Sequence, residues 1–92
     1  MSGSAPELTI LIPTWNNLPY LKFCLDSLRR NTRTSPQIVI HINEGSDGTL
    51  EWVREQGYDY THTARNAGVC EAMNLARTRA RGRYLLYLND DM

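Results

Sequence analysis

Four short strand-like segments alternate with three helix-like segments, and this alternation constrains the fold more than any other feature of the chain. The strand-like segments cover residues 8–13, 37–42, 58–61 and 83–88. Strands separated by helices are typical of a parallel sheet, and strands that are apolar at nearly every position indicate that helices cover both of its faces. The order β-α-β-α-β-α-β therefore predicts an α/β fold with a mostly parallel sheet of about four strands.

The first two helix-like segments carry recognisable start and stop residues. In the first, leucines recur at three- and four-residue steps, Asn17 is suited to cap the helix, and Pro19 fits its first turn. In the second, Ser46 or Asp47 is the expected cap, and Gly57 is the expected stop. Both segments are therefore predicted to be helices of a few turns.

The third helix is expected to begin at Asn66 or its neighbour. Gly82 is expected to stop it in the left-handed conformation that glycine adopts after a helix. One side of this helix is predicted to face the core through Val69, Ala72, Met73, Ala76 and Ala80.

Composition excludes several classes of protein. Among 92 residues, ten basic and ten acidic side chains cancel, so no basic surplus is present for general nucleic-acid binding. Cys24 and Cys70 form no CxxC pair, and each is expected to be a buried free thiol in a reducing compartment. Residues 1–7 lack the pattern of a signal peptide and are expected to form a flexible leader. We therefore expect a cytoplasmic protein, with the inner membrane surface as a second location.

Polar residues follow three of the expected strands at their carboxyl ends. They are TWNN after the first strand, NEGSDG after the second and NDDM after the fourth. Ligands of open parallel sheets bind at this edge. The sequence contains neither a GxxxxGK phosphate loop nor a GxGxxG dinucleotide motif. His41, within a strand, and His62, at a strand end, are expected to be structural.

Four segments together resemble the motifs of family 2 glycosyltransferases in order and spacing. They are LTILIPTWNN, IVIHINEGSDGT, ARNAGVCEAMN and GRYLLYLNDDM. The resemblance implies a truncated GT-A type, Rossmann-like fold in which residues 8–92 form the N-terminal nucleotide-sugar-binding part of a glycosyltransferase domain. It implies transfer of a sugar from a nucleotide-diphosphate sugar to a hydroxyl of a glycan or other acceptor, as in polysaccharide biosynthesis.

The resemblance assigns the nucleotide sugar to residues of the first three motifs. Those expected beside the nucleoside are Pro13, Thr14, Trp15 and Asn16. Glu44 is expected to accept a hydrogen bond from the base, whereas Asn43 and Met73 stand where the family usually has Asp and Arg. In the third motif the expected donor contacts are Asn66, Gly68 and Asn74. The alternatives are a simple turn and helix cap for the first motif, and a solvated helix position for Asn74.

The fourth motif implies a metal. Asn89, Asp90 and Asp91 occupy the place of the family's Asp-x-Asp. The resemblance assigns the ribose to Asn89 and a divalent cation, Mn²⁺ or Mg²⁺, on the donor diphosphate to Asp91. Asp90 holds the variable middle position. The alternative is an exposed acidic strand end without a ligand.

No catalytic residue is expected in this chain, because the family's general base follows the Asp-x-Asp strand. We therefore expect little or no turnover by the isolated chain. The resemblance also predicts that the strand at residues 84–88 forms an uncovered sheet edge and promotes self-association. One alternative function is a non-catalytic nucleotide-binding or interaction module with this fold. Another is a nucleotidyltransferase, although that class needs a glycine-rich basic loop that is absent after the first strand.

Overall fold

The computed structural model describes residues 7–31 and 36–88. Strands and helices follow one another in the predicted order: β1 (Leu8–Trp15), α1 (Leu18–Asn31), β2 (Gln37–Asn43), α2 (Thr49–Gln56), β3 (Asp59–Thr63), α3 (Gly68–Arg77) and β4 (Tyr84–Tyr87). The strands form one sheet in the order β3-β2-β1-β4, and all of its pairings are parallel. The predicted α/β architecture is therefore confirmed.

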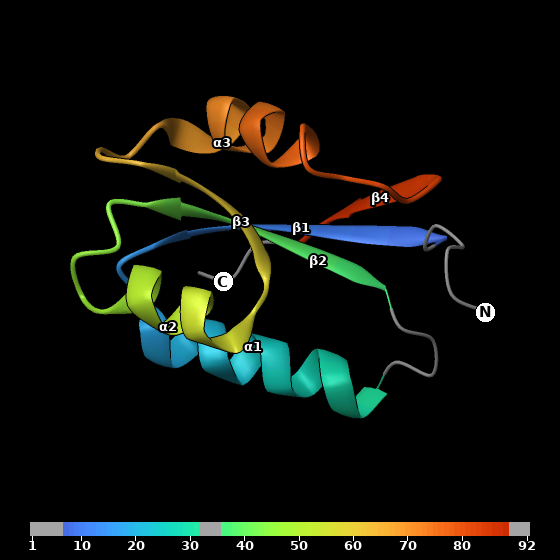
Figure 1. Ribbon diagram of the computed structural model, residues 1–92, viewed down its shortest axis with the longest axis horizontal. Helices are drawn as coiled ribbons and strands as arrows, with labels where there is room; N and C mark the ends of the chain where they lie inside the picture. Colours follow the sequence, from blue (N-terminus) through green and yellow to red (C-terminus); the bar gives the residue numbers. More distant parts are fainter. Residues whose placement is uncertain (1–6, 32–35, 89–92) are drawn as a thin grey trace.

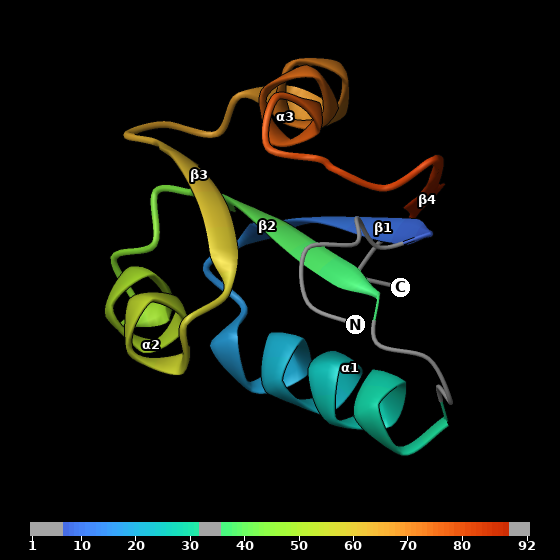
Figure 2. The ribbon, with the colours of Figure 1, turned by 45° about the vertical axis from the view of Figure 1, so that its right-hand side comes forward.

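Helices cover both faces of the sheet, as the apolar strands predicted. Helices α1 and α2 lie on one face, and α3 lies on the other (Figures 1 and 2). Because side chains alternate along a strand, β1 sends Ile10 and Ile12 toward α1 and α2, where they pack with Leu21 and Leu25. The second core, beneath α3, consists of three buried residues: Leu11, Val39 and Ala76.

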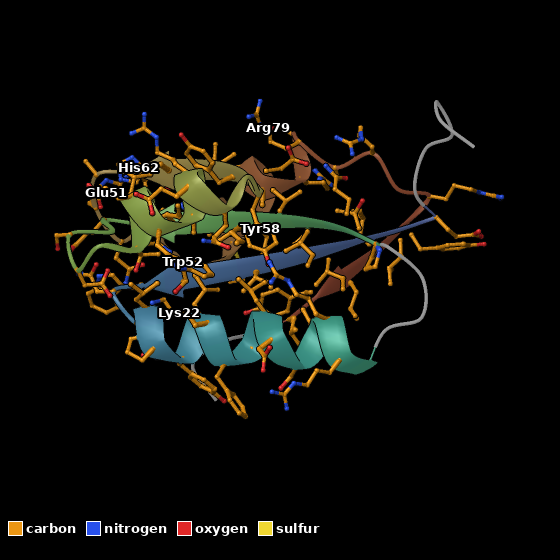
Figure 3. All side chains as sticks on the ribbon, turned by 60° about the horizontal axis from the view of Figure 1, so that its bottom comes forward. Lys22, Glu51, Trp52, Tyr58, His62 and Arg79 are labelled. Atoms are coloured by element: carbon orange, nitrogen blue, oxygen red, sulfur yellow. The ribbon has the colours of Figure 1, made fainter. Side chains whose placement is uncertain are left out.

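Aromatic side chains join α1 to α2 and β3 at the margin of the larger core. Trp52 and Tyr58 pack against that core, with ring centroids 6.3 Å apart. The Lys22 ammonium group lies 5.4 Å from the centroid of the Trp52 ring, and the Arg29 guanidinium lies 5.5 Å from that of Tyr58 (Figure 3). These cation–π contacts add to the apolar packing that holds α2 and the segment just before β3 against α1.

The sheet face under α3 is partly polar, which the apolar strand pattern did not predict. Gln37 is buried, and its side-chain oxygen accepts hydrogen bonds from the Thr9 hydroxyl at 2.8 Å and the Arg81 backbone N–H at 2.7 Å. Its amide nitrogen donates to Asp59 Oδ2 and to the Arg79 carbonyl, each at 2.8 Å. Every donor and acceptor of this amide is therefore satisfied, and it ties three strands to the segment before β4.

Gly82 does not have the predicted left-handed conformation, and α3 ends earlier, at Arg77. Instead, Gly82 packs directly on β1: an added Cβ would lie 2.6 Å from Thr9 Oγ1 and 2.7 Å from the Thr9 backbone nitrogen. Glycine is needed here for close approach. Gly57, in contrast, ends α2 with φ 82°, as predicted.

The Asp47 side chain accepts hydrogen bonds from the first N–H group of two helices, α1 and α2. The sequence predicted Ser46 or Asp47 as the cap of the second helix alone. Asp47 Oδ2 accepts the Leu18 N–H at 3.0 Å at the start of α1, and its Oδ1 accepts the Thr49 N–H at 3.2 Å at the start of α2. Gly48, with φ 98°, is the N-cap residue of α2, so Ser46 and Asp47 both precede it. Partial burial opposes ionisation of Asp47, but the hydrogen bonds from Thr49 and Leu18 outweigh it and lower its pKa.

Strand β4 lies at the sheet edge, as predicted, with its side chains largely exposed. The exposed fractions of Tyr84 and Tyr87 are 57% and 41%, and those of Leu85 and Leu86 lie between them. The described part of the chain therefore does not bury the apolar side chains of β4.

Cys24 and Cys70 form no disulfide with each other, but the predicted burial is wrong for Cys70, which is exposed; Cys24 is half-buried. No described helix combines the length and apolarity needed to cross a membrane.

Candidate functional site

The loops that follow β1, β2 and β3 lie together at the carboxyl ends of these strands, at the left of Figure 1. Here Asn16 and Glu44, which the sequence placed beside the nucleoside, contact each other directly. Asn16 Nδ2 donates to Glu44 Oε1 at 3.1 Å and to Ser46 Oγ at 3.3 Å. We call the residues 14–16, 43–46 and 66–68 the rim. The structure thus brings the first two motifs into one site.

Asn16 and Glu44 also share an unusual backbone conformation. Their φ angles are 46° and 65°, and they are the non-glycine residues with positive φ in the described part of the chain. Such a conformation costs about 1–3 kcal/mol per residue, and residues strained in this way cluster at active sites and ligand clamps. The next residue, Gly45, has φ 76°, and only glycine fits there because an added Cβ would lie 2.7 Å from Ile42 Cγ2.

Asn43 joins the three rim loops through its buried side-chain amide. Its Nδ2 donates to the Thr14 carbonyl at 3.1 Å, and its Oδ1 accepts the Ala67 N–H at 2.8 Å. The Thr63 hydroxyl, which donates to the Arg65 carbonyl at 2.7 Å, lies 3.4 Å from Oδ1. Sequence analysis noted Asn43 only as a departure from the family's Asp. Its donation to the Thr14 carbonyl is an interaction that an ionised Asp cannot make.

Thr14 carries a buried hydroxyl without a partner. The residue is 2% exposed, and its Oγ1 makes no hydrogen bond with any group in residues 7–31 or 36–88. Buried hydroxyls are nearly always hydrogen-bonded, so an exception needs an explanation. This hydroxyl lies at the end of β1, beside the rim loops, and its hydrogen-bonding capacity is not used by the described residues.

One histidine connects β2 to β3, and the other connects β3 to the rim. His41 is buried, as expected of a structural histidine, and its ring nitrogens contact the hydroxyls of Thr61 at 2.7 Å and Thr63 at 3.1 Å. Burial lowers the pKa of His41 below its ordinary value of 6.5, despite an opposing interaction with the Asn43 side chain. His62 Nε2 contacts the Glu44 carbonyl at 2.8 Å, a link to the rim that sequence analysis missed.

The third motif reaches the rim through its loop. Asn66 Oδ1 accepts the Gly68 N–H at 3.2 Å, but α3 begins at Gly68 with Ala67 as its N-cap, one or two residues later than the predicted start at Asn66 or its neighbour. Gly68 has φ 82°, and an added Cβ would meet nothing within 4 Å, so the space beside it is open. Asn74 lies on the exposed side of α3, and the structure describes no hydrogen bond between it and the rim.

Of the remaining predicted site residues, the structure describes two, both in β1, but not those that follow β4. Pro13 is buried within β1, opposite His41, whereas Trp15 is 54% exposed at the end of the strand. Asn89 and Asp91, the predicted ribose and metal contacts, lie outside the described residues, as does Asp90. Within residues 7–31 and 36–88, no three His, Cys, Asp or Glu side chains gather closely enough to hold a metal ion.

Comparison with solved structures supports the fold. The chain superposes on a mannosyltransferase, PcManGT from Pyrobaculum calidifontis, which was solved in complex with GDP-Man and Mn²⁺. The TM-score is 0.81 at 22% sequence identity, over 97% of this chain and 28% of that one. This likeness confirms the expected GT-A type fold.

Sequence comparison identifies the family. An uncharacterized glycosyltransferase, YibD of Escherichia coli, is 31% identical over 99% of this chain, which spans 28% of its length. A PGL/p-HBAD biosynthesis glycosyltransferase of Mycobacterium bovis is 32% identical over 96% of this chain, which spans 36% of its length. The model of the family "Glycosyl transferase family 2" matches residues 9–92. The chain therefore belongs to glycosyl transferase family 2.

Proposed function

We propose that the rim binds a nucleotide-diphosphate sugar and that this chain is the donor-binding part of a glycosyltransferase. The observation that carries the proposal is the contact between Asn16 and Glu44, both in left-handed backbone conformations. Strain of this kind persists where the surrounding structure fixes a side chain in position. The buried Thr14 hydroxyl, which has no hydrogen-bond partner among the described residues, supports the same site.

Each part of the rim has a proposed role. Glu44 accepts a hydrogen bond from the base, and the exposed ring of Trp15 lies beside the nucleoside. The Thr14 hydroxyl and Asn16 are further proposed contacts to the nucleoside. The start of α3, where Gly68 leaves open space, faces the phosphates, because backbone N–H groups at a helix start favour anions. Asn74 is a further proposed donor contact.

We further propose that Asp91 holds Mn²⁺ or Mg²⁺ and that Asn89 contacts the ribose. The Leu88 N–H donates to the Leu11 carbonyl at 2.9 Å, so the last described residue still runs parallel to β1, whose carboxyl end is the rim. A single carboxylate suits a cation that takes most of its oxygen ligands from the diphosphate and water. When bound, such a cation stabilises negative charge on the leaving phosphate. The Mn²⁺ in the structure of the mannosyltransferase supports this proposal.

The transfer reaction is proposed for the whole protein. The acceptor hydroxyl attacks the anomeric carbon, and the nucleoside diphosphate leaves. Because the chain spans 28% and 36% of the two relatives above, it holds only part of what they use. Little or no turnover by the 92-residue chain stays a prediction, and a radiolabelled-donor assay with robust turnover would contradict it.

Calorimetric titration with UDP, GDP and dTDP sugars tests the proposal. We expect one of these donors to bind, and Glu44→Ala to weaken binding about tenfold or more, since it removes a hydrogen bond to a charged group. Glu51→Ala, which removes an exposed carboxylate from α2, is the matched control and should not change binding. If no donor binds with or without Mn²⁺, the non-catalytic interaction module becomes the better explanation of the fold.

A further inference from the structure

We propose that the base selected by the rim is guanine. This inference rests on the proposed nucleotide site and specifies the base within it. It follows from the hydrogen-bond donors and acceptors that Asn16, Glu44 and Ser46 still offer to a ligand after their contacts with each other.

Asn16 uses both hydrogens of its carboxamide nitrogen within the rim. One is donated to Glu44 Oε1 and the other to Ser46 Oγ. Since an amide nitrogen carries two hydrogens, neither remains for a ligand. The group that the exposed Asn16 side chain still offers is its oxygen, Oδ1, which can only accept.

Glu44 likewise offers an acceptor. Its Oε1 receives the bond from Asn16, and its Oε2 receives none from the described residues. A carboxylate only accepts hydrogen bonds. The backbone N–H groups of Glu44 and Gly45 supply no further donor, because the Glu44 N–H already donates to the Thr63 carbonyl at 2.8 Å and the Gly45 N–H to the Asn43 carbonyl at 2.7 Å.

Ser46 supplies the one side-chain donor among these three residues. Its oxygen accepts from Asn16, so the hydroxyl hydrogen is free to turn toward a ligand. The three side chains therefore present one donor, the Ser46 hydroxyl, and two acceptors, Glu44 Oε2 and Asn16 Oδ1.

Guanine matches this set. Its Watson–Crick edge has one acceptor, O6, beside two donors, the N1–H and the exocyclic amine, so the numbers of donors and acceptors are complementary to those of the three side chains. Uracil and thymine present the reverse, one N–H between two carbonyl oxygens. One of their carbonyls would face an acceptor, and buried groups that find no partner weaken binding strongly. Adenine and cytosine each offer a single donor group and leave one rim acceptor without a partner.

The test compares nucleoside diphosphates on the unmodified 92-residue chain by calorimetry in the presence of Mn²⁺. We expect GDP to bind about tenfold or more tightly than UDP, CDP or ADP. Inosine diphosphate lacks only the exocyclic amine of GDP and should bind about tenfold more weakly, because one rim acceptor then loses its donor. This comparison needs no substitution and therefore does not depend on the folding of a variant.

Substitutions locate the effect at the rim. Glu44→Gln places an amide donor at the position of Oε2 and should reduce the preference for GDP over UDP about tenfold. Glu51→Gln makes the same chemical change on the exposed surface of α2 and should leave the preference unchanged. If UDP binds as tightly as GDP, or inosine diphosphate as tightly as GDP, the guanine inference is wrong while the nucleotide site stands. If no nucleotide binds, both the site and the inference are overturned.

Discussion

The side-chain amide of Asn43 donates a hydrogen bond to the carbonyl oxygen of Thr14, 3.1 Å away, across the ends of two adjacent strands. The same amide accepts the N–H of Ala67, so it joins β1 and β2 to the loop before α3. The rim loops are therefore positioned by one buried polar group and not by apolar packing alone.

Asn43→Asp should destabilise the protein. A carboxylate of nearly the same shape cannot donate to the Thr14 carbonyl, and it places a charge at a position that is 4% exposed. We expect the free energy of unfolding to fall by about 3 kcal/mol in urea denaturation at neutral pH. The loss should shrink at acidic pH, where the protonated carboxyl regains a donor. Asn74→Asp, at an exposed position on α3, should cost no more than about 0.5 kcal/mol; equal losses would contradict this role for Asn43.

His41 should make stability depend on pH. Its pKa is lowered in the folded state, chiefly by burial, so the unfolded chain binds the proton more tightly. The stabilising effect of the neutral ring is fully present above the ordinary pKa of 6.5 and is lost as pH falls below it toward the folded-state pKa. Melting temperatures between pH 8 and pH 5 should fall less steeply in His41→Gln than in the parent chain. An unchanged slope in His41→Gln would contradict the assignment.

Gly82→Ala should be much more harmful than Gly57→Ala. At Gly82 the new methyl group would lie 2.7 Å from the Thr9 backbone nitrogen, which cannot move without distorting β1. At Gly57 nothing lies within 4 Å, and the cost comes only from φ 82°. We expect losses of about 3 kcal/mol and about 1 kcal/mol in the free energy of unfolding. Losses of the same size would show that Gly82 is not in a close approach.

Strand β4 should promote self-association. Its sequence, Tyr-Leu-Leu-Tyr, reads the same in both directions. A twofold antiparallel pair therefore sets Tyr84 opposite Tyr87 of the second copy, and Leu85 opposite Leu86, without any mismatch. Light scattering should show a mass that rises with concentration. Leu86→Lys should keep the chain monomeric, since charged residues block edge pairing, whereas Phe23→Lys, at an exposed position on α1, should not. A monomer at high concentration would contradict the prediction.

Sequence periodicity was enough to predict the layers of this fold. Leucines at helical spacing place Leu21 and Leu25 of α1 in the core, and the alternation in β1 places Ile10 and Ile12 against them. The expectation that polar residues meet at the carboxyl ends of the strands follows from parallel pairing. That pairing sets Trp15 opposite Asn43 at the ends of the two strands. The residues that follow them, Asn16 and Glu44, are therefore close enough to form a hydrogen bond with each other.

Contacts between distant residues could not be predicted in the same way. Gly82 has the sequence context of a helix stop, and its role depends on Thr9, 73 residues earlier. The apolar pattern of β2 gave no sign that Gln37 would be held by four hydrogen bonds. Such polar contacts depend on the exact placement of single atoms, which hydrophobic spacing does not determine.

The central claim is that Asp91 would bind a divalent cation on the diphosphate of a nucleotide bound at the rim. Its most direct test is paramagnetic broadening of backbone amide signals by substoichiometric Mn²⁺, added with GDP and, in parallel, with UDP. We predict graded broadening that is strongest for residues 66–68, which face the phosphates in this proposal, smaller for residues 14–16 and 44–46, and weakest for Gln37 and Arg81, at the other end of the sheet. The broadening should disappear in Asp91→Ala. Broadening that avoids the rim, or that persists unchanged in Asp91→Ala, would contradict the account.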